Sequence, residues 1–123
     1  MQKGSCLCGA VTFLVRNERP TGVICHCGQC RKQSGHFWAS SVAEEADIEI
    51  DGDVRWFEAS DAAKRGSCPM CGSFLFWKAH DESTMSFSLG ALAAPAGLSI
   101  SKHIFTRDKD DYYDIADDLP QHR

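Results

Sequence analysis

No stretch of the sequence is apolar for long enough to span a membrane, since a spanning helix needs about 18 consecutive apolar residues. The first residues also lack the apolar segment of a secretory signal peptide. A large basic block is missing and the net charge is −4, whereas a phosphate-binding face needs clustered Lys and Arg. We therefore expect a cytoplasmic protein that binds neither membranes nor nucleic acids.

Helix signals are scarce as well. A long amphipathic pattern is absent, and the apolar residues fall instead in short runs separated by turn residues. These runs predict strands at residues 10–15, 22–24, 37–42, 47–50, 54–57, 73–77, 84–89 and 102–105. The turn signal at residues 51–53 predicts a hairpin between the strands on either side of it. The chain of 123 residues has the size of one domain, residues 1–123, and we expect that domain to be mainly β.

Three segments outside these strands carry weaker signals. Residues 30–34 predict a single helical turn that ends at Gly35. Residues 91–96 predict either a short helix or a loop, because Pro95 interrupts them. The tail at residues 108–123 is acidic and broken by Pro120, so we expect a loosely held surface segment.

Cysteine, by contrast, is plentiful, with seven residues in the chain. Lasting disulfides are rare in the cytosol, and an odd number of cysteines leaves one thiol unpaired in any disulfide scheme. The cysteines form three groups: an N-terminal pair (Cys6 and Cys8), a central triad (Cys25, Cys27 and Cys30) and a knuckle pair (Cys68 and Cys71). Since thiolates bind zinc at ~2.3 Å in a tetrahedral arrangement, this grouping indicates metal sites.

The knuckle pair lies in a Cys-x-x-Cys motif, which zinc knuckles share with redox-active pairs. A thioredoxin-like motif is followed by a helix, whereas residues 73–77 predict a strand. Gly72 follows the second cysteine and can adopt the positive φ that a knuckle turn requires. The zinc knuckle is therefore the favoured interpretation.

Counting ligands favours one division of the cysteines. The knuckle pair needs two further ligands for a closed tetrahedral site, and the N-terminal pair can supply them. The central triad then forms a second site that is one protein ligand short, which is typical of a catalytic metal. In the alternative division, the central triad takes a fourth ligand from the N-terminal pair and the other site stays incomplete.

The motifs also resemble those of a known family. In order they are Gly4-Ser5-Cys6-Leu7-Cys8-Gly9-Ala10-Val11, Cys25-His26-Cys27 through Cys30-Arg31-Lys32 to Gly35, and Cys68-Pro69-Met70-Cys71-Gly72, followed by His103-Ile104-Phe105 and the tail from Asp114 to Pro120. This pattern resembles the glutathione-dependent formaldehyde-activating enzyme family, also called the Gfa or centromere-protein-V-like family. The resemblance extends over nearly the whole chain.

The resemblance implies a β-tent-like fold, in which twisted antiparallel sheets are built around two zinc ions. Matching positions imply a structural zinc on Cys6, Cys8, Cys68 and Cys71, and a catalytic zinc on Cys25, Cys27 and Cys30. Family members with the named activity join glutathione and formaldehyde into S-hydroxymethylglutathione. A carbon–sulfur lyase-type enzyme that acts on a small-molecule thiol such as glutathione is therefore implied.

Charged residues next to the central triad are candidate substrate contacts. Arg31 suits a bidentate contact with a carboxylate and Lys32 supplies a point charge, so we predict that they bind the carboxylates of a peptide-like thiol. The alternative is a solvated surface pair. His26 lies between two ligands and is expected to point away from their metal, and His103 is expected to be a structural histidine.

A second hypothesis for the function is a non-enzymatic zinc module that binds a protein partner through its β surface. The fourth position on the central zinc distinguishes the two hypotheses. An exchangeable position favours chemistry, whereas a position filled by a protein group favours the module. The sequence predicts no oligomeric state.

Overall fold

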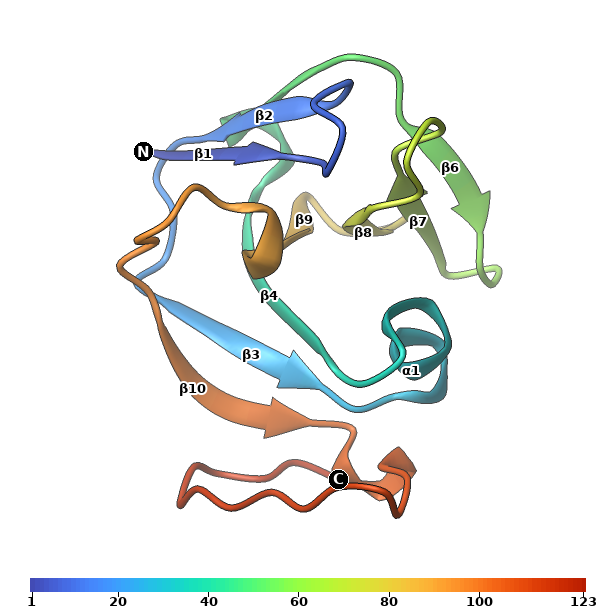
Figure 1. Cartoon of the computed structure of the whole chain (residues 1–123), viewed down its shortest axis with the longest axis vertical. Coiled ribbons are helices and arrows are strands. Elements are labelled where there is room, and N and C mark those ends of the chain that lie inside the picture. Colours follow the sequence, from blue (N-terminus) through green and yellow to red (C-terminus); the bar gives the residue numbers. More distant parts are fainter.

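The computed structural model describes all residues, 1–123, and consists of two β-sheets with little helix (Figure 1). The smaller sheet has three strands in the order β1 (Gln2–Ser5), β2 (Thr12–Val15) and β5 (Ile48–Asp51). The larger sheet has seven, in the order β10 (Ser99–Ile104), β3 (Thr21–Cys25), β4 (Trp38–Glu44), β9 (Thr84–Ser88), β8 (Phe74–Ala79), β7 (Ala63–Ser67) and β6 (Arg55–Glu58). The prediction of a mainly β fold of twisted sheets is confirmed.

The one α-helix, α1 (Gly28–Ser34), contains the predicted helical turn at residues 30–34. It ends at Gly35, whose φ of 80° is the left-handed conformation that favours glycine at a helix C-terminus. Three short 3-10 helices complete the chain: η1 (Glu45–Asp47), η2 (Leu89–Ala91) and η3 (Thr106–Asp108). None of these helices has the length and apolar character needed to cross a bilayer.

The main hydrophobic core lies between the two sheets. Phe13 of β2 packs edge-on against Phe76 of β8 at a ring-centroid distance of 5.0 Å, and Phe87 of β9 completes the aromatic cluster. All three side chains are buried. Gly4 of β1 makes room for this cluster, because a Cβ atom at that position would lie 2.1 Å from the Phe13 ring. One face of the larger sheet is thus covered by the smaller sheet.

The opposite face of the larger sheet carries the central triad. Residues directly opposite each other on neighbouring strands point to the same face of a sheet. Cys25 pairs with Trp38 of β4 and with Ile104 of β10, so these three side chains share a face. On β7 and β8, Arg65 pairs with Trp77. One face of the larger sheet therefore packs in the core, and the other face carries the residues of the candidate site.

All eight strands predicted from the sequence overlap observed strands. The two that were not predicted, β1 and β7, contain glycine, serine and charged residues in place of an apolar alternation. Burial explains why they form. Gly4 on β1 lies against the core, and β7 buries both Ala63 and Arg65.

The predicted hairpin between residues 47–50 and 54–57 is wrong. β5 pairs with β2 in the smaller sheet, whereas β6 pairs with β7 in the larger one. Gly52, with a φ of +102°, turns the chain between the sheets, and a Cβ there would lie 2.2 Å from the Ala10 carbonyl oxygen. Ile48 is buried opposite Val15. Burial in the core, rather than the turn signal, decides the partner of β5.

One strand pair departs from the antiparallel arrangement. β10, the last strand, pairs in parallel with β3, with a register shift between Ile100 and Lys102. This pairing places His103 beside Ile24 and Ile104 beside Cys25. The final strand thereby lies next to the central triad.

The expectation of a loosely held tail is also wrong. Residues 109–123 run along the outer edge of β10, as the red segment of Figure 1 shows. The His103 amide donates to the Pro120 carbonyl at 2.9 Å, and the His122 amide donates to the His103 carbonyl at 2.9 Å. An uncovered edge strand leaves its backbone groups without partners, and the tail supplies those partners here.

Candidate functional site

The N-terminal pair and the knuckle pair come together as the closed site. The first pair lies in the β1–β2 loop and the second in the β7–β8 loop, and their four Sγ atoms all lie within 4.8 Å of one another. The Cys6–Cys8 and Cys8–Cys68 sulfur distances are 3.7 and 3.8 Å. A zinc–sulfur bond of ~2.3 Å in a tetrahedron requires sulfur atoms about 3.8 Å apart, whereas a disulfide requires about 2.05 Å. The closed site therefore fits a four-thiolate metal ion.

Hydrogen bonds support the thiolate form of Cys6, Cys68 and Cys71. For Cys8, a backbone hydrogen bond from Ala10 acts in the same direction, but desolvation and the three neighbouring thiols outweigh it and raise the pKa to about 11. The amide of Val11 donates to the Cys6 Sγ at 3.3 Å, and the amide of Met70 donates to the Cys68 Sγ at 3.4 Å. The hydroxyl of Ser73 lies 3.2 Å from the Cys71 Sγ and lowers the pKa of Cys71 to about 5. Because the thiolate is the form that ligates metal, these contacts prepare the site for an ion.

The central triad forms where β3 passes into α1. Cys25 ends β3, Cys27 is the N-cap of α1 and Cys30 lies in its first turn. The Cys30 amide donates to the Cys27 Sγ at 3.3 Å, so the helix start fixes two of the ligands relative to each other. All three Sγ atoms lie within 4.8 Å of one another. The structure thus brings together the same groups of four and three cysteines that counting favoured.

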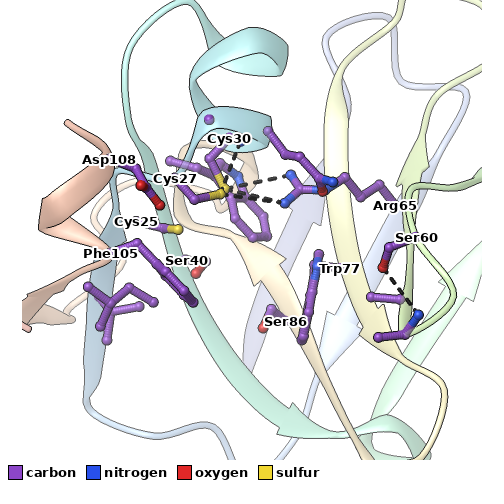
Figure 2. Close-up of a pocket in the computed structure, with 17 residues that line it drawn as sticks. Cys25, Cys27, Cys30, Ser40, Ser60, Arg65, Trp77, Ser86, Phe105 and Asp108 are labelled. Atoms are coloured by element: carbon purple, nitrogen blue, oxygen red, sulfur yellow. Dashed lines mark hydrogen bonds between the residues drawn. The ribbon is translucent and has the colours of Figure 1, made fainter. Parts of the chain in front are cut away.

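The central triad opens into a cavity of about 530 Å³ (Figure 2). Most of its wall is apolar, with Trp38, Trp77 and Ile104 contributing large surfaces. Phe105 also lines the cavity, and its φ of 53° is uncommon for a residue other than glycine. Such strained residues cluster at ligand sites. A three-ligand metal site that faces a cavity has its fourth position available to a small molecule.

Arg65 is the functional residue that the sequence analysis missed. The residue is 4% exposed, and its guanidinium points at the central triad in Figure 2 and lies 3.6 Å from the Cys30 Sγ. Gln29 and Gln33 of α1 each accept a hydrogen bond from it, at 3.0 and 2.9 Å. No sequence signal marks this arginine, because it sits on the unpredicted strand β7.

The thiols of Cys25 and Cys27 differ in the direction of their pKa shifts. Hydrogen bonds with the thiols of Cys25 and Cys30, followed by the positive charge of Arg65, hold the pKa of Cys27 well below its ordinary value. The hydrogen bond with Cys27 raises the pKa of Cys25. A buried guanidinium beside these sulfurs compensates for the negative charge that three thiolates bring to one ion.

The two predicted substrate contacts do not line this cavity. Arg31 Nη1 lies 3.4 Å from the Asp110 carboxylate, and Lys32 is exposed. Their role in binding a thiol stays a prediction. The His26 ring is buried and hydrogen-bonds to His103 and Tyr113, away from the thiols.

A second, more polar cavity of about 450 Å³ adjoins the first. The two share Val23, Ser40, Ser86 and Ile104 as lining residues. The second cavity extends to the cations of Arg19 and Lys102 and to the carboxylate of Glu82. Together they form one groove that leads from the sulfur atoms to charged groups.

Comparison with known proteins identifies a matching family and a solved structure with a similar fold. A sequence model of the glutathione-dependent formaldehyde-activating enzyme family matches residues 1–108. No curated protein matches the chain significantly. Among solved structures, the crystal structure of a Rhodobacter sphaeroides protein from a structural genomics programme is similar, with a TM-score of 0.63 and 21% sequence identity.

That structural match covers 80% of this chain and 98% of the other, and at this identity it shows the fold alone. The family match is more specific, because it spans all seven cysteines of the closed site and the central triad. The chain belongs to the glutathione-dependent formaldehyde-activating enzyme family.

Proposed function

We propose that this protein is a zinc-dependent, carbon–sulfur lyase-type enzyme that forms a thiol adduct, with glutathione and formaldehyde as the candidate substrates. One observation supports this proposal most. The closed site offers four thiolates, whereas the central triad offers three and faces a cavity. A metal with an open position beside a cavity is typical of catalysis rather than of structure alone.

The reaction joins the sulfur of glutathione to the carbon of formaldehyde. The thiol loses its proton, a carbon–sulfur bond forms, and the carbonyl oxygen gains a proton to become a hydroxyl group. Zinc bound by the central triad would favour the thiolate form of glutathione and hold its sulfur in place. No oxidant or further substrate is needed, because the product contains every atom of the two reactants.

The residues of the chain set the surroundings of this reaction. Arg65 offsets one negative charge of the thiolates, so the bound thiolate of the substrate leaves the site with one excess negative charge. Trp38 and Trp77 provide apolar walls that limit the access of water. The hydroxyl groups of Ser40 and Ser86, which also line the cavity, are groups that can hydrogen-bond the carbonyl oxygen.

Recognition of glutathione requires cations for its two carboxylates. The predicted contacts are Arg31 and Lys32, which lie next to the central triad in sequence but outside the cavity lining. Arg19 and Lys102 are an alternative pair, because they line the polar end of the groove. Both pairs are tested below.

A specific observation favours the second hypothesis, the non-enzymatic zinc module. Leu7 and Met70 lie in the two loops of the closed site and are 88% and 78% exposed. Exposed apolar side chains mark a protein-binding surface where they form one contiguous patch, so the second hypothesis requires Leu7 and Met70 to lie together. Such binding would use the outer side of the closed site and leave the cavity of the central triad without a role.

The decisive experiment adds glutathione and formaldehyde to zinc-loaded protein and follows exchange between free and adduct formaldehyde by NMR. We expect the exchange rate to rise in proportion to protein concentration. Cys27→Ser is the matched control, because it removes a ligand of the central triad and leaves the closed site intact. If wild-type protein neither accelerates exchange nor binds glutathione, the enzymatic proposal fails and the protein-binding module is favoured.

A further inference from the structure

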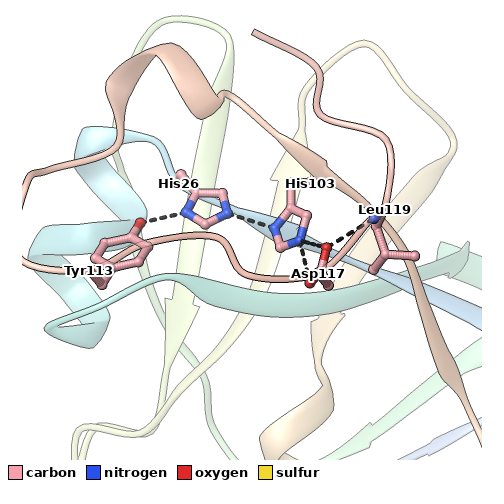
Figure 3. A network of polar contacts seen from close by, with 5 residues as sticks. All are labelled: His26, His103, Tyr113, Asp117 and Leu119. Atoms are coloured by element: carbon pink, nitrogen blue, oxygen red, sulfur yellow. Dashed lines mark hydrogen bonds and ion pairs between the residues drawn. The ribbon is translucent and has the colours of Figure 1, made fainter.

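A chain of four polar side chains links the tail to the central triad (Figure 3). The carboxylate of Asp117 lies 3.0 Å from His103 Nε2, and His103 Nδ1 lies 2.9 Å from His26 Nε2. The other nitrogen of His26, Nδ1, hydrogen-bonds to the hydroxyl of Tyr113. Asp117 and Tyr113 belong to the tail, whereas His103 lies on β10 and His26 lies between two cysteines of the triad.

One assignment of protons satisfies every hydrogen bond in this series of four side chains. A carboxylate only accepts, so Nε2 of His103 carries a hydrogen and donates to Asp117. In a neutral imidazole, Nδ1 of His103 is then an acceptor, and it receives the hydrogen on Nε2 of His26. Nδ1 of His26 in turn accepts from the Tyr113 hydroxyl. The two histidines are only 1% and 4% exposed, so loss of either tail group leaves a buried ring nitrogen without its partner.

His26 is held on two sides. Its backbone amide donates to the Ile104 carbonyl at 3.0 Å, and its ring is fixed by the polar chain. Because His26 joins Cys25 to Cys27, fixing its backbone and its ring limits the backbone rotations that place these two thiols.

The tail also contacts the residue that follows the third ligand. Asp110 lies 3.4 Å from the guanidinium of Arg31, the residue that follows Cys30. The rings of Tyr113 and His36 pack edge-to-face at 4.3 Å, just beyond the end of α1. The tail thus contacts the chain on both sides of the α1 N-terminus, where the three cysteines converge.

Tyr113 and Asp117 lie outside residues 1–108, which match the family model, although Asp117 falls within the tail segment that resembles the ending of that family. We propose that Tyr113 and Asp117 are positioning residues for the central triad, which act through His26 and His103 to hold its thiols in a metal-binding arrangement. This proposal rests on the metal-binding role of the triad and not on the identity of the substrates. Partner groups of this kind typically contribute about 10- to 100-fold to metal affinity.

The test measures the affinity of both sites for zinc and cobalt(II) in competition with a chromophoric chelator. Tyr113→Phe removes one hydroxyl group, and Asp117→Ala removes the carboxylate. We expect either variant to lower the metal affinity of the central triad by about 10- to 100-fold and to change its cobalt(II) absorption spectrum. The affinity of the closed site should stay at the wild-type value, which serves as an internal measure of folding.

Matched variants separate positioning from a general effect on the tail. Tyr112→Phe and Asp118→Ala alter the neighbouring, exposed residues of the same types. Tyr112→Phe removes only a long hydrogen bond of 3.5 Å to the Gly35 carbonyl, and both variants should leave both affinities unchanged. Asp117→Asn keeps an acceptor for His103 and should restore most of the affinity that Asp117→Ala loses. The proposal is overturned if Tyr113→Phe and Asp117→Ala leave the central triad unchanged. It is also overturned if they weaken both sites equally or prevent folding, since the tail would then hold the whole fold.

Discussion

Both terminal nitrogens of the Arg65 guanidinium lie 3.6 Å from the Sγ atom of Cys30. Its third nitrogen, Nε, donates to Gln29, and its Cζ atom lies 5.3 Å from the centre of the Phe74 ring. A buried cation is therefore a fixed part of the central triad. Three thiolates and one divalent ion carry a net negative charge, which Arg65 compensates inside the protein.

We predict that Arg65→Gln weakens metal binding at the central triad. Hydrogen bonds to charged groups contribute about 1.5–3 kcal/mol, so the affinity should fall by about ten- to a hundred-fold. Without this cation protons compete better for the thiolates, and metal release should begin at a higher pH. Titration of cobalt(II) binding against pH measures both effects.

Lys64→Gln is the matched control for Arg65→Gln, because it removes a cation from the adjacent position of β7. The ammonium of Lys64 lies 4.4 Å from the centre of the Trp56 ring and contacts no cysteine. Lys64→Gln should leave unchanged the pH at which each site releases its metal ion. Equal behaviour of the two variants would show that Arg65 acts only through the overall charge.

The two metal sites should differ in how fast they lose their ions. The closed site surrounds its ion with four thiolates, whereas the central triad leaves one side open to the cavity. Adding a chelator in steps should remove about one equivalent of zinc quickly while the far-ultraviolet circular dichroism is unchanged. The second equivalent should leave only as the protein unfolds. Release of both ions in a single phase would contradict this division.

Substitutions in the two sites should have separate effects. The closed site joins the β1–β2 loop to the β7–β8 loop, and structural zinc contributes an apparent ~10–16 kcal/mol in small domains. Cys71→Ser should therefore impair folding, whereas Cys27→Ser should retain the fold and lose thiol binding. Thermal unfolding and glutathione titration of both variants measure this. Equal loss of soluble protein would indicate that the central triad is structural too.

Two pairs of cations compete for the role of binding the carboxylates of glutathione. If Arg31 and Lys32 bind them, replacing both by Ala should lower the affinity for glutathione by about ten- to a hundred-fold. The affinity for a neutral thiol of similar size should be unchanged. If the polar end of the groove binds them, Arg19→Ala with Lys102→Ala should have that effect instead. Calorimetric titration of both thiols into the two double variants measures the difference. Equal binding of glutathione and the neutral thiol to wild type would exclude both pairs.

The contribution of Asp117 to stability should depend on pH. The hydrogen bond from His103 lowers the pKa of Asp117 in the folded protein, so the unfolded state binds more protons at low pH. The stabilisation is fully present above the unfolded value of about 3.9 and is lost as pH falls through the folded value.

Urea unfolding of wild type and Asp117→Asn between pH 3 and pH 7 measures this contribution. The difference in the free energy of unfolding should be constant at neutral pH and shrink below about pH 4. Protonation of the cysteine ligands affects both proteins alike, so the difference reports on Asp117 together with its partner His103. A difference that is independent of pH would show that the Asp117 charge makes no contribution.

The sequence could reveal the cysteine groups because their signal is local. Close spacing in the central triad and the knuckle pair restricts each group to one side of a turn, and counting ligands then assigns the N-terminal pair. The strands were predictable for the same reason, since each shows its own apolar alternation. These features require no knowledge of which segments meet in space.

The remaining parts of the site depend on contacts between distant segments. Arg65 reaches the central triad only because β7 and α1 lie together, and Tyr113 reaches His26 only because β10 pairs with β3. A tail without apolar alternation gives no local sign of the edge that it covers. The wrong hairpin has the same origin, because Ile48 is buried against the smaller sheet rather than beside the strand that follows it.

The parallel pairing of β3 with β10 also sets an order of events during synthesis. The ribosome makes a chain from its N-terminus, and a domain folds as a unit. The last ligand of the closed site is Cys71, so all four of its cysteines precede β9 and β10 in the chain. The cysteines of the central triad emerge earlier, yet Ile104, Tyr113 and Asp117 are among the last residues to appear. The contacts that β10 and the tail make beside the central triad can therefore form only when synthesis of the chain is nearly complete.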